Sequence, residues 1–297
     1  MNAAVLRFLF AARLVLALIT FKLAWSLGML PALLLAACAF WSYCWLALLR
    51  FLRLPRINAD QAVGAPRFRA MPGVWWREMR DCERLFAWAQ PFHAQRCGDS
   101  VDRGDYTRRG VLLLHGYLCN RGMWQDWMPL LAERGHPCIA LTQEPAYGSI
   151  DDYADAIQAA YLKLRESNGA APAIVAHSMG GLALRAWWRK YGGANTPLYR
   201  AVTLGTPHGG TAAANLGVTR NAVQMRPGSP WLVALAAESP PGLAARCISY
   251  FSHADSVVYP ADTAVLAGGE ARHRPGLGHV SLAVDPAIMT EVLAELA

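Results

Sequence analysis

The sequence is poor in charge and has no regular cysteine pattern. Asp, Glu, Lys and Arg make up 16% of its 297 residues, whereas 54% are hydrophobic. Its seven cysteines are odd in number and irregularly spaced, so neither a disulfide framework nor a zinc-binding motif is visible. Cys138 and Cys247 lie in apolar runs typical of strands, where a cysteine usually serves as a small core residue.

Acidic residues are scarce in the first third of the chain. Residues 1–110 contain 15 Lys or Arg and 7 Asp or Glu, a net charge of +8, whereas residues 111–297 contain 13 and 14, a net charge of −1. The basic residues flank an apolar segment and do not form a patch interleaved with aromatic residues, so the pattern does not favour nucleic acid as a partner. Basic residues beside an apolar span instead favour anionic lipid headgroups.

A run without any charged residue extends from residue 23 to residue 49. About 20 apolar residues cross the core of a bilayer, so this run is long enough to span it with a tilt or with a bend at Pro31. A weaker apolar stretch, residues 3–21, contains two arginines. The sequence therefore predicts that residues 1–56 are a membrane anchor, either one transmembrane helix or a hairpin of two whose tip lies around residues 22–30.

The sequence leaves two questions about this anchor: whether it is cleaved or retained, and on which side of the membrane its C-terminal end lies. Residues 35–38, Leu-Ala-Ala-Cys, resemble a lipoprotein cleavage box, but the apolar run continues to Leu52, which a processed signal would not do. Arg50, Arg53 and Arg56 place the end of the run on the cytoplasmic face by the positive-inside rule, whereas the two earlier arginines oppose this for a single span. We therefore expect retention in a bacterial inner membrane, with the cytoplasmic side favoured and sidedness open.

Residues 57–110 are predicted to join the anchor to the rest of the chain. Proline and glycine mark residues 57–73 as a linker, and residues 74–90 form a predicted amphipathic helix rich in tryptophan and arginine. Such a helix either lies on the bilayer surface or packs on the domain that follows. The polar residues 91–110 are expected to form a loop or short antiparallel strands.

From Val111 onward, short apolar runs alternate with amphipathic segments. Strands that alternate with helices predict an α/β domain over residues 111–297, in which a mostly parallel sheet is covered by helices on both faces. Residues 211–245, apolar and broken by four prolines, are expected to be either a mobile cap or an insertion packed on the sheet edge. The expected strands are 111–115, 137–142, 173–176, 199–204, 247–251 and 264–266, and the expected helices are 123–133, 151–166, 181–191 and 286–296.

The stretch from Ala173 to Gly181 has the features of a sharp turn between a strand and a helix. It reads Ala-Ile-Val-Ala-His-Ser-Met-Gly-Gly, in which Ala176 and Gly180 stand two residues before and after Ser178. A turn that projects a serine hydroxyl from the end of a parallel sheet brings its neighbours almost into contact, so these positions require small residues. Ser178 is therefore the predicted nucleophile, and the N–H groups of the following helix are expected to face the reacting oxygen.

Four motifs together resemble the α/β-hydrolase superfamily, and within it the bacterial lipases and esterases. They read LLHGY at 113–117, VAHSMGG at 175–181, TLGTPHGG at 203–210 and GH at 278–279. They come in the family's order, each at the end of a predicted strand, and the resemblance covers residues 111–297. It implies a base and an acid for Ser178, because a serine hydroxyl must pass its proton to a histidine that a carboxylate orients.

The resemblance also implies which residues fill these roles. His279 is the implied base, with His273 as a rival in the same loop, and Asp255 is the implied acid because the acid follows strand 247–251 in this fold. Asp262 is the alternative acid, and Glu238 comes too early in the chain.

Backbone groups are implied to complete the site. The N–H groups of Tyr117 and Met179 would stabilise the oxyanion of the tetrahedral intermediate. The remaining motif residues are implied to shape the oxyanion loop and the turn at Ser178; they are His115, Gly116, His177 and Gly180.

These residues predict a membrane-anchored serine hydrolase that cleaves carboxylic esters, above all lipid acyl esters, through an acyl-enzyme. No metal or organic cofactor is implied; the expected partners are the ester substrate and the bilayer, and the oligomeric state is open. The alternative enzyme is a phospholipase or lysophospholipase that acts on the host bilayer. The alternative from another class is a non-catalytic membrane scaffold that retains the fold, although a scaffold does not need a nucleophile, a base and an acid together.

Overall fold

The computed structural model describes residues 2–102, 108–193 and 196–296. Its core is a six-stranded sheet in the order β2-β1-β3-β4-β5-β6, in which every neighbouring pair is parallel. The predicted α/β class with a parallel sheet is thus confirmed. The strands are β1 (Val111–Leu114), β2 (Cys138–Leu141), β3 (Ala173–His177), β4 (Arg200–Leu204), β5 (Cys247–Phe251) and β6 (Glu270–His273).

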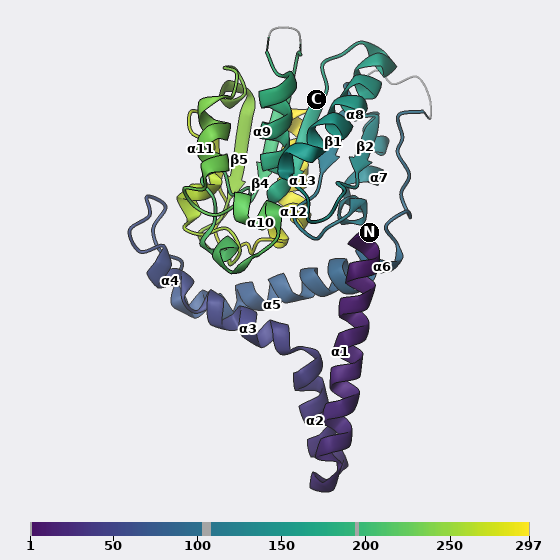
Figure 1. Ribbon diagram of the computed structural model, residues 1–297, viewed down its shortest axis with the longest axis vertical. Coiled ribbons are helices and arrows are strands. Elements are labelled where there is room, and N and C mark those ends of the chain that lie inside the picture. The colour runs from purple at the N-terminus through teal and green to yellow at the C-terminus, as the bar shows by residue number, and fades with distance from the viewer. Residues whose placement is uncertain (1, 103–107, 194–195, 297) are drawn as a thin grey trace.

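Helices cover both faces of the sheet (Figure 1). Helices α8 and α9 pack on one face, and α7, α12 and α13 pack on the other. Each face has its own buried apolar layer because successive side chains of a strand point to opposite faces, so Leu112 and Leu114 enter one layer and Val111 and Leu113 the other. These helices are α7 (Trp127–Glu133), α8 (Ala154–Asn168), α9 (Met179–Tyr191), α12 (Ser281–Val284) and α13 (Pro286–Glu295).

Three predicted elements differ from the structure, and one of them is the helix predicted at 151–166, which is divided into a 3-10 helix, Ile150–Tyr153, and α8. The strand predicted at 264–266 is wrong: Ala261–Ala264 is a 3-10 helix, and the sixth strand is β6, whose partly exposed edge position gives it no apolar pattern to detect. The helix predicted at 123–133 is divided into a 3-10 helix, Arg121–Trp124, and α7. A continuous helix would need an N–H at Pro129 to bond the carbonyl of Gln125, and proline has none.

The region predicted as 211–245 contains three short helical pieces and α11. The 3-10 helix Ala212–Leu216 and α10 (Arg220–Gln224) come first, followed by α11 (Pro230–Ala237) and the 3-10 helix Ala244–Arg246. Residues 91–102 and 108–110 contain the end of α6 and no strand, and residues 103–107 of the expected loop lie outside the described part of the chain.

The N-terminal residues form a helical hairpin that projects away from the domain (Figure 1). Helix α1 (Asn2–Ala24) and helix α2 (Met29–Phe40) are joined by a 3-10 turn, Trp25–Leu27, inside the predicted tip. The helical stretch Asn2–Leu27 is long and apolar enough to cross a membrane, whereas Met29–Phe40 and Ser42–Ile57 meet that test only as a pair bent by 60°. Such an apolar N-terminal helix is also compatible with a signal sequence.

A second group of helices lies across the base of the hairpin (Figure 1). The predicted helix 74–90 is present as α5, a π-helical turn and α6, and its α5 part packs between α3 and the α/β domain through Met71, Val74, Met79 and Ala254. Of the two arrangements left open, packing on the domain is therefore observed, and Trp76 and Trp88 remain exposed on its outer side. These elements are α3 (Ser42–Phe51), α4 (Leu54–Ile57), α5 (Met71–Cys82), the π-helical turn Glu83–Ala89 and α6 (Gln90–Phe92).

Candidate active site

The turn between β3 and α9 holds Ser178 in a left-handed conformation, with φ of 56° and ψ of −129°. A non-glycine residue is rarely found there, and such strain persists only where the surroundings enforce it. Here the Ser178 N–H donates to the carbonyl of Leu204 at 2.9 Å. Gly180 is required because a Cβ atom on it would lie 2.4 Å from the carbonyl oxygen of Leu114. The predicted sharp turn and its need for small residues are therefore seen directly.

Three side chains from different loops form one hydrogen-bonded chain. The Nε2 atom of His279 lies 2.9 Å from Ser178 Oγ, and its Nδ1 atom lies 2.8 Å from Asp255 Oδ2. The other oxygen of Asp255 accepts the N–H groups of Val257 and Val258, both at 2.8 Å. Asp255 is only 2% exposed, so these bonds fix the carboxylate in one orientation.

The rival residues lie elsewhere. His273 is in β6, where its ring packs against the ring of His253 at 4.6 Å. Asp262 is exposed in the 3-10 helix after Pro260, and Glu238 forms an ion pair with Arg189 at 3.1 Å. The structure thus brings His279 and Asp255, and not their rivals, to Ser178.

Burial and the neighbouring carboxylate have opposite effects on His279. Burial lowers its pKa, but the charge and the hydrogen bond of Asp255 outweigh this, so the pKa is raised above the ordinary value. A proton on Nδ1 is held by the carboxylate, which leaves Nε2 free to accept a proton from Ser178.

The loop after β1 packs directly on the turn at Ser178. A Cβ atom on Gly116 would lie 2.8 Å from the Cβ of Ser178, so only glycine fits. Among the described residues, no hydrogen-bond acceptor is found for the N–H groups of Tyr117 and Met179. Two N–H groups beside the serine are therefore free to donate to an oxygen atom placed there.

His115 holds this loop as a neutral side chain. Its Nδ1 atom lies 2.8 Å from the carbonyl oxygen of Gly116, and its Nε2 atom accepts the N–H of Gln143 at 2.8 Å. One nitrogen donates and the other accepts, which requires the uncharged ring. Burial lowers the pKa of His115 to about 4, in agreement with this pattern.

His177 supports the histidine loop from the other side. Its Nε2 atom lies 3.0 Å from the carbonyl oxygen of His279, and the two rings are 4.6 Å apart. Burial, together with the nearby His279, keeps the pKa of His177 well below its ordinary value. His177 therefore stays neutral and donates to the backbone of the residue that faces Ser178.

Glu78 of α5 is a site residue that the sequence did not reveal. Its two oxygens accept the N–H groups of Val280 at 2.8 Å and Ser281 at 2.9 Å, the residues that follow His279. It is 2% exposed, and a Cβ atom on Gly278 would lie 2.3 Å from Glu78 Oε2. An available signal was its place four residues after Val74 and seven after Met71, on the apolar side of the helix.

We expect Glu78→Ala to lower kcat by about 10- to 100-fold, because a histidine displaced by a fraction of an ångström loses alignment with Ser178. Glu78→Gln, which keeps one acceptor oxygen, is expected to recover part of this loss. The charge of Glu78 raises the pKa of His279. In Glu78→Gln that pKa therefore falls, and the acidic limb of the kcat/KM profile moves to lower pH.

Rates against pH for a soluble short-chain ester measure both effects, with the exposed Glu133→Gln as a control. If activity falls only as much as the amount of folded protein, and the acidic limb of the kcat/KM profile does not move, Glu78 contributes to packing alone and does not position His279.

An apolar pocket of about 140 Å³ adjoins Ser178. One side of it is formed by the first half of the predicted cap, residues 211–225, and the hydroxyl of Tyr117 reaches Thr219 Oγ1 of this segment at 3.1 Å. Leu216 and Val218 are 82% and 90% exposed beside this pocket. The second half of the cap region is packed on the domain, since α11 contacts α9 and Trp231 donates to Asp151 at 2.8 Å.

Within the described ranges, no group of three or more His, Cys, Asp or Glu side chains is placed to hold a metal ion.

Residues 111–293 match the model of the alpha/beta hydrolase family. The match covers more than half of the chain, so the protein belongs to this family, as its motifs implied.

Solved structures with a similar fold include two lipases. The Bacillus licheniformis lipase BlEst2 in its mature form superposes with a TM-score of 0.55 at 14% identity, over 67% of this chain and 97% of that one. Aspergillus fumigatus lipase B superposes with a TM-score of 0.51 at 12% identity, over 65% of this chain and 53% of that one. At these identities the similarity establishes the fold alone. No match was found among curated proteins.

Proposed function

We propose that the protein is a membrane-associated serine hydrolase that cleaves the carboxylic ester bonds of lipids. The observation that carries the proposal is the hydrogen-bonded chain from Ser178 through His279 to Asp255. It is set at a strained turn beside two N–H groups for which the described part of the chain provides no acceptor. Acyl transfer through an acyl-enzyme requires a serine hydrogen-bonded to a histidine that is itself hydrogen-bonded to a carboxylate. In this fold the three residues follow one another along the chain as serine, acid and histidine.

Each group has one role in the proposed reaction. Ser178 Oγ attacks the carbonyl carbon while its proton moves to His279 Nε2, and the N–H groups of Tyr117 and Met179 stabilise the negative oxygen. The ester C–O bond then breaks, and the leaving alcohol takes the proton from His279. Water repeats the two steps on the acyl-enzyme and releases the carboxylic acid, while Asp255 keeps His279 oriented throughout.

Two features support a lipid substrate. The pocket beside Ser178 is lined mostly by apolar residues such as Met225 and Val258, which suits an acyl chain. The site also lies at the end of the sheet that faces α5, next to the apolar hairpin, since Glu78 of α5 bonds the loop of His279 (Figure 1). Entry from a bilayer, and opening of residues 211–225 as a cap, belong to the proposal.

A panel of esters tests the proposal. The purified full-length protein is treated with a fluorophosphonate probe and then assayed on a short-chain aryl ester, emulsified triacylglycerol and phospholipid vesicles. We expect labelling by the probe and hydrolysis of at least one lipid ester. Release of fatty acid from the phospholipid alone would favour the phospholipase alternative. Absence of both labelling and hydrolysis would favour a scaffold and contradict the proposal.

A further inference from the structure

The hairpin of α1 and α2 is fastened at its base by Arg13. Its guanidinium donates to the carbonyl of Phe40, the last residue of α2, at 3.0 Å and forms an ion pair with Glu83 at 2.5 Å. The hydroxyl of Tyr43 donates to the same carboxylate at 2.5 Å. These contacts join both ends of the hairpin to the helical layer beside the domain, so only residues 14–39 project freely.

The first half of α1 belongs to the domain. The side chain of Asn2 donates to the carbonyl of Cys119, in the loop after β1, at 2.5 Å, and the rings of Phe10 and Phe92 meet edge to face at 6.0 Å. The start of α1 accordingly lies beside α6 (Figure 1). A bilayer crossing by all of Asn2–Leu27 would draw into the hydrocarbon core the residues that contact the middle of α1, namely Phe92 beside Phe10 and Glu83 beside Arg13.

The free part of the hairpin is too short to cross a bilayer. Helix α2 has 12 residues and is therefore about 18 Å long at 1.5 Å per residue. The hydrocarbon core is about 30 Å thick. If the base lies at the headgroups, the tip at residues 25–28 ends inside the core.

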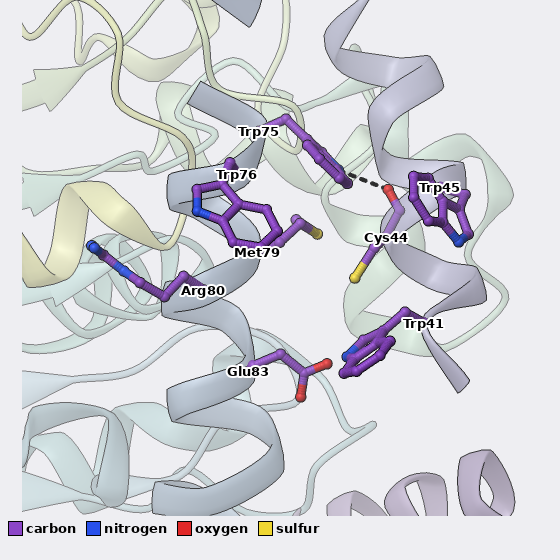
Figure 2. Close-up of a pocket in the computed structure, with 8 residues that line it drawn as sticks. All are labelled: Trp41, Cys44, Trp45, Trp75, Trp76, Met79, Arg80 and Glu83. Atoms are coloured by element: carbon purple, nitrogen blue, oxygen red, sulfur yellow. Dashed lines mark hydrogen bonds between the residues drawn. The ribbon is translucent and has the colours of Figure 1, made fainter. Parts of the chain in front are cut away.

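The surface around the base has the chemistry of a membrane interface. Figure 2 shows Trp41, Trp45 and Trp76 around a pocket between α3 and α5, where Trp75 donates to the carbonyl of Cys44 at 2.8 Å. Tryptophan rings gather at the headgroup level of bilayers. Exposed arginines surround the same layer and suit anionic headgroups; they are Arg50, Arg53, Arg56, Arg67, Arg69 and Arg80.

The free hairpin exposes large apolar side chains along its length. This face has no protein partner among the described residues, and lipid tails are the occupant that fits an apolar surface bordered by tryptophan and arginine. The exposed residues are Leu14, Val15, Leu16, Leu18, Ile19, Leu23, Trp25, Leu27, Met29, Leu30, Leu33, Leu34 and Leu35.

We propose that this hairpin enters only the leaflet next to the catalytic domain and ends within the bilayer, so that the protein is held from one side. The inference rests on the membrane association proposed above and adds the depth and the sidedness of the contact. Lys22, the one charged residue in the free part, lies on α1 near the tip and is exposed. In this arrangement the ammonium of Lys22 lies within the hydrocarbon core, where a charge is unfavourable.

Cysteine labelling at the tip tests the inference. The full-length protein with Cys38→Ala, whose other six cysteines are buried or half-buried, carries Leu27→Cys at the tip or Ala237→Cys on the outer side of α11. Each variant is reconstituted in vesicles of phosphatidylethanolamine and phosphatidylglycerol. We expect a membrane-impermeant maleimide to modify position 237 from outside. Position 27 should stay unmodified, even when freeze–thaw admits the reagent to the lumen, and should react after detergent is added.

Fluorescence depth measurements give the positive signal. A fluorophore at position 27 should be quenched more by a nitroxide at carbon 12 of the lipid chain than by one at carbon 5, and a fluorophore at Leu49→Cys on α3 should show the reverse. Modification of position 27 from the lumen would overturn the one-leaflet arrangement in favour of a crossing hairpin. Modification from outside without lipid quenching would overturn membrane insertion itself, whereas the ester assays above are independent of both.

The charge of Lys22 provides a second measurement. If the tip lies within the core, Lys22→Leu should bind these vesicles about tenfold more tightly, because a charged group in the core is unfavourable. Unchanged or weaker binding would place the ammonium in water beyond the core and contradict the inference.

Discussion

Ser178→Ala is expected to reduce hydrolysis of a short-chain aryl ester by roughly 10⁵- to 10⁶-fold and to abolish fluorophosphonate labelling. The Ser178 hydroxyl lies 2.9 Å from His279 Nε2, and alanine leaves this base without a proton to accept. The alanine side chain is smaller and the backbone is held by the same Leu204 hydrogen bond, so the folded state should be retained.

The control for Ser178 is Ser239→Ala, since Ser239 bonds only the carbonyl of Leu235 at the end of α11. Initial rates, labelling and melting temperature are compared for both variants. Activity that survives in a folded Ser178→Ala protein would place the nucleophile elsewhere in the chain.

Asp255→Asn is expected to lower kcat by roughly 10³- to 10⁴-fold although it changes almost no volume. The Oδ1 atom of Asp255 accepts two N–H groups, those of Val257 and Val258. Asparagine must keep its carbonyl oxygen there, which turns its NH₂ group toward His279 Nδ1. His279 then accepts at Nδ1 and carries its proton on Nε2, so it cannot take the proton of Ser178.

The pH profile separates this mechanism from a loss of folding. Asp255 raises the pKa of His279, so the charged histidine persists to higher pH in the unchanged protein and activity falls as the pH drops through that pKa. In Asp255→Asn the pKa is lower, and the acidic limb of kcat/KM should move to lower pH. Asp262→Asn, at the exposed alternative acid, is the matched control and should leave both rate and profile unchanged. Equal losses in the two variants would contradict the role of Asp255.

The parts of the site that follow strands were predictable from the sequence. Ser178 and Asp255 follow the apolar strands β3 and β5, and parallel pairing brings the carboxyl ends of these strands to one edge of the sheet. His279 was predicted instead from the Gly-His motif that the family resemblance supplied. Chain order and the resemblance of residues 252–258 to the family's acid loop together favoured Asp255 over Asp262. The polar edge strand β6 was missed because only its pairing with β5, and no apolar pattern, defines it.

Contacts between distant segments were not predictable. The bonds from Glu78 to Val280 and Ser281 join residues more than 200 positions apart, and one acidic residue in an amphipathic helix does not reveal whether it faces water or a buried N–H. The contacts of Arg13 with Phe40 and Glu83 also join residues far apart in the sequence and were not predictable for the same reason. In the sequence, Arg13 is only a charged residue inside an apolar run. In the structure, it lies at the point where the hairpin begins to project from the helical layer beside the domain.

The contact between α5 and the histidine loop also bears on where this protein can be shortened. The family match begins at residue 111, yet a fragment cut at that point would lose Glu78, whose carboxylate accepts the N–H groups of Val280 and Ser281 and so holds the loop of His279. We therefore expect the smallest fragment that keeps the active-site geometry to start before Met71. A water-soluble version would have to retain α5 and replace the apolar side chains that α3 covers. The segment that matches the family model and the segment that we expect to keep the active-site geometry therefore begin at different places in this chain.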